Sequence, residues 1–362
     1  MTSITKMKEG TTHIDYIIVG CGLAGIAFCE QLLSNNKTFM VMDDSSQQSS
    51  TVAGGLYNPV TLKRFTPVWQ SKAQLTVALP MYHKIEKRLN IRLDYKIPVR
   101  KRFTSLEEHN NWFARSDREG LSEYMSLDIY KNKNTSIISE FGFGEVLETG
   151  RIDTKLLISA YKKDLHKKKL LIKDAIAYSQ IQCADQTIKY KTLSAKHIIF
   201  AEGFGLKKNP FFKTLPLEGS KGELITIKAP DLKLEYVLKS SVFIIPLGNA
   251  LYRVGSTYEK TDKTNCITTQ AKEVLINKLK TIITCDFEVV NQVAGIRPTV
   301  IDRKPLVGQH PKHNNLYVLN GLGTRGVMIG PYAASQLYNY IEHNTALAPE
   351  LNIERFQDLK KF

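Results

Sequence analysis

The sequence predicts an α/β fold, in part α+β, built from two separate groups of strands. A strand, a glycine-rich turn, a helix and a second strand follow one another within residues 15–44. Another buried-type strand, residues 196–201, comes much later and also ends beside a glycine. Between residues 211 and 291, strand-like runs recur with turn signals between them, a spacing typical of a mostly antiparallel sheet. The 362 residues suffice for about two domains.

The N-terminal strand and its turn have the pattern of a dinucleotide-binding site. The apolar run Tyr16–Val19 leads into the motif G-x-G-x-x-G at residues 20–25, and the helix-like segment Ile26–Leu33 follows. The N-terminus of that helix would offer free N–H groups and a partial positive charge to a pyrophosphate. The residues predicted to form this cradle are Gly20, Gly22, Leu23, Ala24 and Gly25.

Each glycine of the motif, and the acid that follows it, has a separate task. The first glycine permits the tight turn, the second lets phosphate approach the backbone, and the third lets the helix pack closely on the strand. A second apolar run, Phe39–Met42, ends at Asp43, which is placed to accept a hydrogen bond from a ribose hydroxyl. The motif alone does not separate FAD from NAD, and a glycine turn in another kind of α/β protein is the alternative.

The segments between residues 44 and 166 are predicted to contain loops and amphipathic helices, with short strand-like runs between residues 91 and 138. The pair Gly54-Gly55 would let the backbone approach the ring end of a nucleotide cofactor, or would form an ordinary surface turn. Apolar positions at helical spacing predict helices over 71–89 and 106–116. A third helix is predicted over 154–166, with Asp153 as its N-cap.

The second half of the chain supplies the remaining strands. Because the strand at 196–201 would complete the nucleotide-binding sheet, that domain is predicted to be discontinuous, with residues 1–90, 145–205 and 291–362. Residues 91–144 and 206–290 would form a substrate-binding domain. Strands are predicted at 224–227, 241–245, 251–254, 287–290 and 316–319, and helices at 269–282 and 331–342.

Composition argues against several kinds of site. The five cysteines are odd in number and include no C-x-x-C pair, which argues against disulfides, zinc and a redox pair and favours the reducing cytoplasm. The eight histidines include no H-x-x-x-H pair, so no metal site is predicted. No apolar stretch is long enough to span a bilayer, and the polar segment Met1–His13 is predicted to be a loose arm rather than a secretory signal.

The net charge of +15 leaves two interpretations open. Basic residues cluster in residues 161–169 and 100–102. Such clusters favour binding to nucleic acid or another polyanion. The alternative is a lysine-rich solvated surface, because no aromatic interleaving and no nucleic-acid motif accompany the clusters.

Taken in order, these segments resemble the D-amino-acid oxidase (DAO) family of FAD-dependent oxidoreductases, in particular its glycine- and sarcosine-oxidase-like members. The likeness extends from about residue 15 to residue 342. Besides the opening motif, the segments that carry it are Gly54-Gly55-Leu56, Ser220–Leu224 (SKGEL), Phe243–Pro246, Val254–Tyr258, Gly295–Pro298 (GIRP) and Gly321–Pro331.

The resemblance implies a discontinuous, Rossmann-like FAD-binding domain of the glutathione-reductase type, and a mixed or antiparallel substrate domain. No cysteine is placed for a covalent flavin link, so FAD is expected to be noncovalent. The cofactor-binding residues that carry over are Gly20, Gly22, Leu23, Ala24, Gly25, Asp43, Asp44, Gly54, Gly55, Leu56, Ala201, Gly203, Gly321, Gly323, Thr324, Gly326, Val327 and Met328.

The activity that the resemblance implies is oxidation of the C–N bond of a small amino acid or an N-substituted glycine. Hydride would pass to flavin N5, and water would hydrolyse the imine. Arg297 would hold the substrate carboxylate in a bidentate grip, and an internal salt bridge is the alternative role for it. Phe243 stands where glycine oxidases have an active-site tyrosine, so Tyr258 and Arg325 are the candidate second polar anchors.

Three other functions remain open. The segments 55–59 and 321–326 resemble the oxidase domain of the bifunctional enzymes that modify the wobble uridine of tRNA. That likeness implies removal of a carboxymethyl group from carboxymethylaminomethyl-uridine, and a tRNA partner would suit the positive charge. A 2-hydroxy-acid dehydrogenase and a dinucleotide-binding protein without turnover are the remaining alternatives.

Overall fold

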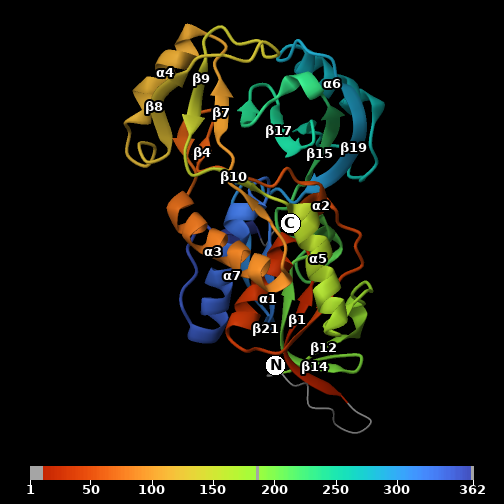
Figure 1. Ribbon diagram of the computed structural model, residues 1–362. Helices are drawn as coiled ribbons and strands as arrows, with labels where there is room; N and C mark the ends of the chain where they lie inside the picture. The colour runs from red at the N-terminus through yellow and green to blue at the C-terminus, as the bar shows by residue number, and fades with distance from the viewer. Residues whose placement is uncertain (1–10, 185–186, 360–362) are drawn as a thin grey trace.

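Two eight-stranded sheets, one above the other in Figure 1, form the framework of the molecule. The computed structural model describes residues 11–184 and 187–359. It confirms the predicted α/β fold with a second, mixed sheet. Most of the predicted N-terminal arm lies outside the described residues, while Thr12 and His13 belong to the first strand.

The lower sheet has the parallel core expected of a nucleotide-binding fold. Its strands run in the order β11-β2-β1-β14-β13-β12, with β21 beside β14 and β20 beside β21. The strands β11, β2, β1, β14 and β21 pair with one another in that order, and each of these pairs is parallel. The bounds are β1 Thr12–Val19, β2 Phe39–Met42, β11 Leu171–Ile172, β12 Ile181–Cys183, β13 Ile188–Tyr190, β14 Leu193–Phe200, β20 Leu306–His310 and β21 His313–Asn320.

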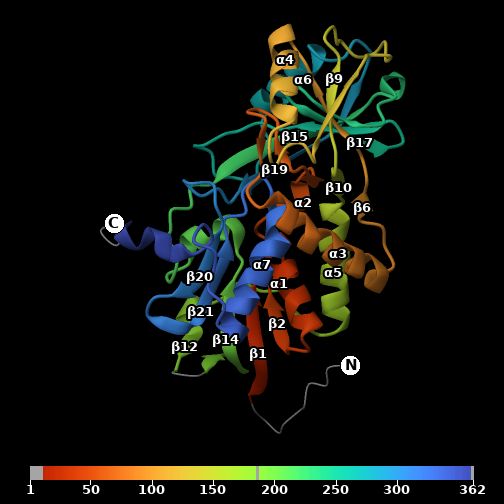
Figure 2. The same ribbon diagram turned by 90° about the vertical axis from the view of Figure 1, so that its left-hand side faces the viewer.

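Four helices cover the lower sheet and bury one large apolar cluster with it. They are α1 (Leu23–Ser34), α3 (Ser71–Leu89), α5 (Thr154–Lys167) and α7 (Gly326–His343). Helix α1 is buried on nearly every side because it lies between the sheet and α7, as Figure 2 shows. Asp153 caps α5 as predicted, since its carboxylate accepts a hydrogen bond from the Leu156 N–H at 3.0 Å.

The upper sheet is mostly antiparallel, as predicted, with one exception. Its order is β19-β15-β18-β17-β16-β7-β9-β8, and only the β16–β7 pair is parallel. Helices α4 (Leu106–Ser116) and α6 (Thr269–Lys280) belong to this half. The strands are β7 Val99–Arg102, β8 Met125–Tyr130, β9 Phe143–Val146, β15 Ser220–Lys228, β16 Val237–Lys239, β17 Phe243–Gly248, β18 Leu251–Gly255 and β19 Glu288–Arg297.

The remaining elements are short. The remaining bounds are α2 Ser49–Val52, β3 Leu56–Tyr57, β4 Val60–Thr61, β5 Thr66–Pro67, β6 Asp94–Tyr95 and β10 Gly150–Ile152, with 3₁₀ helices at η1 Tyr178–Gln180, η2 Gly203–Lys208, η3 Pro230–Leu232 and η4 Ile353–Leu359. The lower sheet takes its strands from residues 12–42, 171–200 and 306–320, so this half is discontinuous. The division at residues 90, 144, 205 and 290 stays a prediction; β19 continues in the upper sheet to Arg297.

Helix α7 begins at Gly326, five residues before the predicted start at Pro331. Proline is common in the first turn of a helix. Inside a helix, proline lacks the N–H that would bond to the carbonyl four residues earlier, here that of Val327. The Tyr82 hydroxyl of α3 donates to that carbonyl instead, at 2.9 Å, so the packing of α3 makes the longer helix possible.

No helix in the described part of the chain combines the length and the apolar character needed to cross a membrane.

Candidate active site

A cavity of about 1470 Å³ extends from the lower sheet to the upper sheet. The lower part of its wall comes from the glycine motif, the ends of β2 and β14 and the start of α7. The upper part comes from β15, β16, β17 and the end of β19. All the predicted cofactor-binding residues line this cavity except Gly25. The predicted polar anchors Arg297, Tyr258 and Arg325 line it as well.

The glycine motif forms a cradle that side chains would close. Gly20 has φ +101°, and a methyl group there would collide with the Ala201 carbonyl at the end of β14. A methyl group at Gly25 would collide with the Gly20 carbonyl, so this glycine serves helix packing rather than the cavity lining. Gly22 immediately precedes α1 and lines the cavity, so the helix N-terminus lies in the cavity wall, where the Leu23 N–H donates to the Ser50 hydroxyl at 3.2 Å.

Asp43 is held at the end of β2 by several donors, among them two backbone N–H groups. Its carboxylate accepts from the Cys21 N–H at 2.5 Å, from the Ser45 N–H at 2.9 Å and from the Lys162 ammonium at 2.6 Å. These bonds fix the acid against the glycine motif. Its predicted contact with a ribose hydroxyl stays a prediction, and so does that of the neighbouring Asp44, which also lines the cavity.

The other predicted glycine segments bring backbone close to the middle of the cavity. Gly55 has φ +72°, and a methyl group there would collide with the Ile152 carbonyl of β10. A methyl group at Gly54 would lie 2.9 Å from the Ile245 side chain of the upper sheet. Gly321 and Gly323 have φ of +72° and +57°, and a methyl group on Gly323 would meet nothing within 4 Å. The cavity is therefore unobstructed at this glycine.

Arg297 lies at the end of β19 with its guanidinium directly over Gly222 of β15. A methyl group at Gly222 would occupy the place of the guanidinium nitrogens. Arg297 Nη2 donates to the Ser256 hydroxyl at 2.6 Å and to the Thr257 carbonyl at 3.3 Å. Its Cζ lies 4.6 Å from the centroid of the Tyr258 ring, which is itself 69% exposed.

Arg297 has no acidic partner in the described part of the chain. Its Nη1 is buried without any hydrogen-bond partner, and burial lowers the pKa of the guanidinium. The alternative role of an internal salt bridge therefore finds no support in residues 11–184 and 187–359. A buried cation without a counterion is costly, so the arrangement favours an anion as the missing partner.

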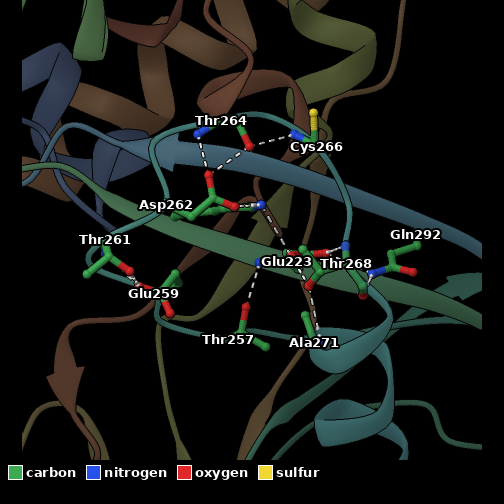
Figure 3. Close-up of polar contacts among 11 residues, drawn as sticks. Glu223, Thr257, Glu259, Thr261, Asp262, Thr264, Cys266, Thr268, Ala271 and Gln292 are labelled. Atoms are coloured by element: carbon green, nitrogen blue, oxygen red, sulfur yellow. Dashed lines mark hydrogen bonds and ion pairs between the residues drawn. The ribbon is translucent and has the colours of Figure 1, made fainter.

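The loop that carries Ser256 and Tyr258 is tied to β15 from the other face of the sheet. Alternation along β15 directs Gly222 to the cavity and directs Lys221 and Glu223 away from it. Figure 3 shows Glu223 accepting hydrogen bonds from the backbone N–H and the hydroxyl of Thr268, at 2.9 and 2.8 Å. Lys221 Nζ lies 2.5 Å from Asp262 Oδ2.

Arg325 lies just before α7 and is the second buried guanidinium of the cavity. It donates to the Thr61 hydroxyl at 2.8 Å and forms no salt bridge with any described residue. Burial lowers the pKa of Arg325, and the Tyr258 phenol acts in the opposite direction on both Arg325 and Arg297. The structure thus brings the three predicted anchors to one part of the cavity.

Several charged residues line the cavity that were not predicted from the sequence, among them Lys162, Glu202 and Lys239. In the sequence, Lys162 stands out only as part of a basic cluster. Glu202 lies between two predicted cofactor residues, Ala201 and Gly203. An acidic residue directly after a buried strand could have marked it as a cavity residue. Lys239 follows two apolar residues of β16, and no local pattern marks it, because its place in the cavity depends on strand pairing.

Comparison with known proteins gives one family and several distant relatives. The model of the family "DAO: FAD dependent oxidoreductase" matches residues 15–339. The glycine oxidase of Bacillus subtilis (strain 168) is 22% identical over 236 residues, which are 62% of this chain and 63% of that protein. The "tRNA 5-methylaminomethyl-2-thiouridine biosynthesis bifunctional protein MnmC" of Azoarcus sp. (strain BH72) is 24% identical over 165 residues, 40% of this chain and 26% of that protein.

Solved structures share the fold. The glycine oxidase of Geobacillus kaustophilus superposes with a TM-score of 0.76 at 17% identity, over 93% of this chain and 96% of that one. The iminodiacetate oxidase of Chelativorans sp. BNC1 has a TM-score of 0.73 at 15% identity, over 92% and 97%. The structural likeness thus covers both sheets, whereas the chain spans less than two thirds of its B. subtilis relative in the sequence match.

Proposed function

The chain belongs to the DAO family of FAD-dependent oxidoreductases, and we propose that it oxidises the C–N bond of a small amino acid or an N-substituted glycine. The observation that carries this proposal is Arg297, a buried guanidinium that faces the cavity and has no acidic partner among the described residues. A substrate carboxylate would supply the missing charge and accept the hydrogen bond that Nη1 lacks.

The residues present fit an extended dinucleotide. The cradle at Gly20 and Gly22 and the start of α1 suit a pyrophosphate, because a helix N-terminus presents free N–H groups. The start of α7 is a second helix N-terminus in the cavity wall. Burial raises the pKa of Cys21 to about 12, so the thiol in the cradle stays protonated, which supports noncovalent binding of FAD.

The flavin of this family supplies the hydride acceptor, and the chain supplies position. Arg297 would hold the carboxylate, which restricts the neighbouring Cα to a small part of the cavity. The hydrogen bonds from Arg297 to Ser256 and Thr257 fix the plane of the guanidinium in advance of binding. Phe243 and Ile245 line the same part of the cavity and would exclude water from the reacting carbon.

The test is reduction of the FAD-loaded protein without oxygen. Glycine, sarcosine or another N-alkyl glycine should bleach the flavin absorbance, and glycolate tests the 2-hydroxy-acid alternative in the same assay. If no small amine bleaches the flavin, the proposal is wrong; bleaching by glycolate alone would favour the 2-hydroxy-acid dehydrogenase.

Replacing Arg297 tests the role of its guanidinium. Arg297→Met should lower the second-order rate constant of reduction by about 100-fold or more, because loss of one partner of a buried charge pair costs about 3 kcal/mol. Exposed Arg118, which does not line the cavity, gives the matched control Arg118→Met. Equal rates for both variants would remove Arg297 from the mechanism.

One alternative substrate, carboxymethylaminomethyl-uridine in tRNA, is favoured by a specific observation. Basic residues line the cavity at several exposed positions, among them Lys63, Lys208, Lys260 and Arg303. Such side chains would suit the phosphates around a modified base. Binding of modified tRNA that weakens steeply between 50 and 200 mM salt, on the order of 10³-fold, would favour this substrate. No binding at low salt would exclude it.

A further inference from the structure

Lys239 is a further cation in the cavity wall, on a different strand from Arg297. It is the last residue of β16 and lines the cavity. Direct pairing joins Leu224 to Gly255, Gly255 to Phe243 and Phe243 to Lys239. Residues directly opposite in an antiparallel sheet project to the same face. This row therefore places the lysine on the face that carries Leu224 and Phe243, which also line the cavity.

The Lys239 side chain extends from β16 back over the neighbouring strand. Its Nζ lies 4.7 Å from the centroid of the Phe243 ring and donates to the Ser240 carbonyl at 2.6 Å. An ammonium group has three N–H donors, so two remain for a ligand. Ser241, at the start of the turn into β17, lines the cavity beside it.

The surroundings of Lys239 lack the acid that would neutralise it. No carboxylate of the described residues lies within 4 Å of its Nζ. The charged groups that act on it are Lys101 and Lys278, which are repulsive, and Glu108, which is bonded to Lys101 at 2.7 Å. Burial, with the two lysines, lowers the pKa of Lys239 to about 8. An anionic ligand would relieve both the desolvation and the repulsion.

The spacing of the two cations defines the length of a ligand that reaches both. The Arg297 guanidinium lies over Gly222 on β15, and the Lys239 ammonium lies near Phe243 on β17. The two cations lie two strand spacings apart across the sheet and two residues apart along the strand. The distance between them is therefore roughly 12 Å. Two carboxylates joined through a six-bond chain that contains the amine would span it. Phe243 and Ile245 provide apolar wall for the methylenes.

We propose that Lys239 forms an anion subsite, and that the preferred substrates are secondary amines with two acidic arms. A carboxymethyl arm would bind at Arg297, and a second arm of about three methylenes would place its terminal carboxylate at Lys239. The proposal rests on the proposed function for the identity of the first arm. Beyond the proposed function, it specifies that the second arm of the substrate ends in a carboxylate and how long that arm is.

Calorimetry with inert thioethers tests the subsite without turnover. The FAD-loaded protein is titrated with 4-(carboxymethylthio)butanoic acid and with butylthioacetic acid, which lacks the second carboxylate. The diacid should bind at least about tenfold more tightly, since the added carboxylate would form charge-assisted hydrogen bonds to the Lys239 ammonium. Lys239→Met should reduce this ratio to about twofold or less, and Lys239→Arg should keep most of it.

The control is exposed Lys228 of β15, which does not line the cavity; Lys228→Met should keep the full ratio. Affinity for the monoacid shows in each variant whether the rest of the site is intact. Equal affinity of the natural chain for the two thioethers would overturn the proposal. So would a ratio that Lys239→Met leaves unchanged.

Flavin reduction by the matching amines separates this proposal from the proposed function. N-(3-carboxypropyl)glycine should reduce the flavin with a second-order rate constant at least about tenfold above that of N-butylglycine. If both amines react equally and both thioethers bind equally, the subsite is wrong and the oxidase function stands. If the diacid thioether is preferred but no amine bleaches the flavin, the subsite stands and the oxidase function is wrong.

Discussion

At the scale of single residues, the site depends on a cation that lies where a side chain is missing. The guanidinium of Arg297 occupies the space over Gly222, and Ser256 holds it there through a 2.6 Å hydrogen bond. A strand residue other than glycine would fill this space with its Cβ. The glycine of the K-G-E segment is therefore explained by the position of the arginine, in addition to its family resemblance.

Gly222→Ala should displace the guanidinium and weaken substrate binding. We expect the dissociation constant for a carboxylate substrate to rise at least about tenfold, because the added methyl group collides with the guanidinium nitrogens. Affinity for FAD, measured by flavin fluorescence, should change much less because the cradle is on the lower sheet. A variant that binds carboxylates as tightly as the natural chain would contradict this account of the glycine.

Glu202 is a buried acid at the cradle, and its environment makes stability depend on pH. Burial raises the pKa of Glu202 to about 7. Hydrogen bonds from Asn209, at 2.7 Å, and from the Tyr178 hydroxyl act in the opposite direction but are the smaller effect. Between the ordinary value of 4.5 and 7, the folded chain holds a proton that the unfolded chain releases. Stability therefore falls as pH rises through this interval and levels off above it.

Glu202→Gln should remove this dependence. The stability of the variant relative to the natural chain should increase from pH 4.5 to above pH 7 by up to about 3 kcal/mol. Guanidinium unfolding of both proteins at pH 5 and pH 8 measures the change, and all other titrating groups cancel in the comparison. Two curves of stability against pH that run parallel would show that Glu202 is already ionised at pH 5.

At the scale of elements, the start of α7 depends on a neighbouring helix. Tyr82 of α3 supplies the hydrogen bond that Pro331 cannot make to the Val327 carbonyl. Val327 lines the cavity, so this bond also shapes the wall near the cofactor. The helical residues before the proline thus rely on a tertiary contact to satisfy the Val327 carbonyl.

Tyr82→Phe should destabilise the protein by about 1–3 kcal/mol, because it leaves a buried carbonyl without a partner. The matched control is Tyr332→Phe, since the Tyr332 hydroxyl has no hydrogen-bond partner within the residues that the structure describes. Urea unfolding of the two variants measures the difference. Equal losses for Tyr82→Phe and Tyr332→Phe would mean that the bond to Val327 contributes nothing.

At the scale of the whole molecule, the cavity joins two halves that have separate apolar cores. One pair of clusters belongs to the lower sheet and its helices, and another pair to the upper sheet. Residues of both halves line the cavity. A dinucleotide bound there would contact both halves and stabilise their association.

Removal of FAD should therefore separate the unfolding of the two halves. We expect the FAD-free protein to show two calorimetric transitions, and FAD at 100 times its dissociation constant to add about 2.7 kcal/mol of stability and merge them. Differential scanning calorimetry with and without FAD measures both effects. A single transition that FAD does not move would contradict the predicted binding across the two halves.

Local patterns in the sequence were enough for much of the fold. Strand 39–42 and helices 71–89 and 106–116 coincide with β2, α3 and α4. The period of apolar residues is a local property, and the glycine motif is determined by a local turn. The cradle residues were predicted from this local motif, whereas Arg297 was predicted as the carboxylate anchor from the family resemblance, and both assignments stay predictions. Their places in one cavity follow from the structure.

The sequence by itself therefore determined the kind of fold, the glycine cradle and the candidate anchor Arg297. Only the tertiary structure decided that Arg297 lies over Gly222 without an acidic partner among the described residues, and that Lys239 belongs to the same cavity. The physical reason is that burial and strand pairing join residues far apart in the chain. No pattern within a short window records which neighbours a charge will have when its strand is paired.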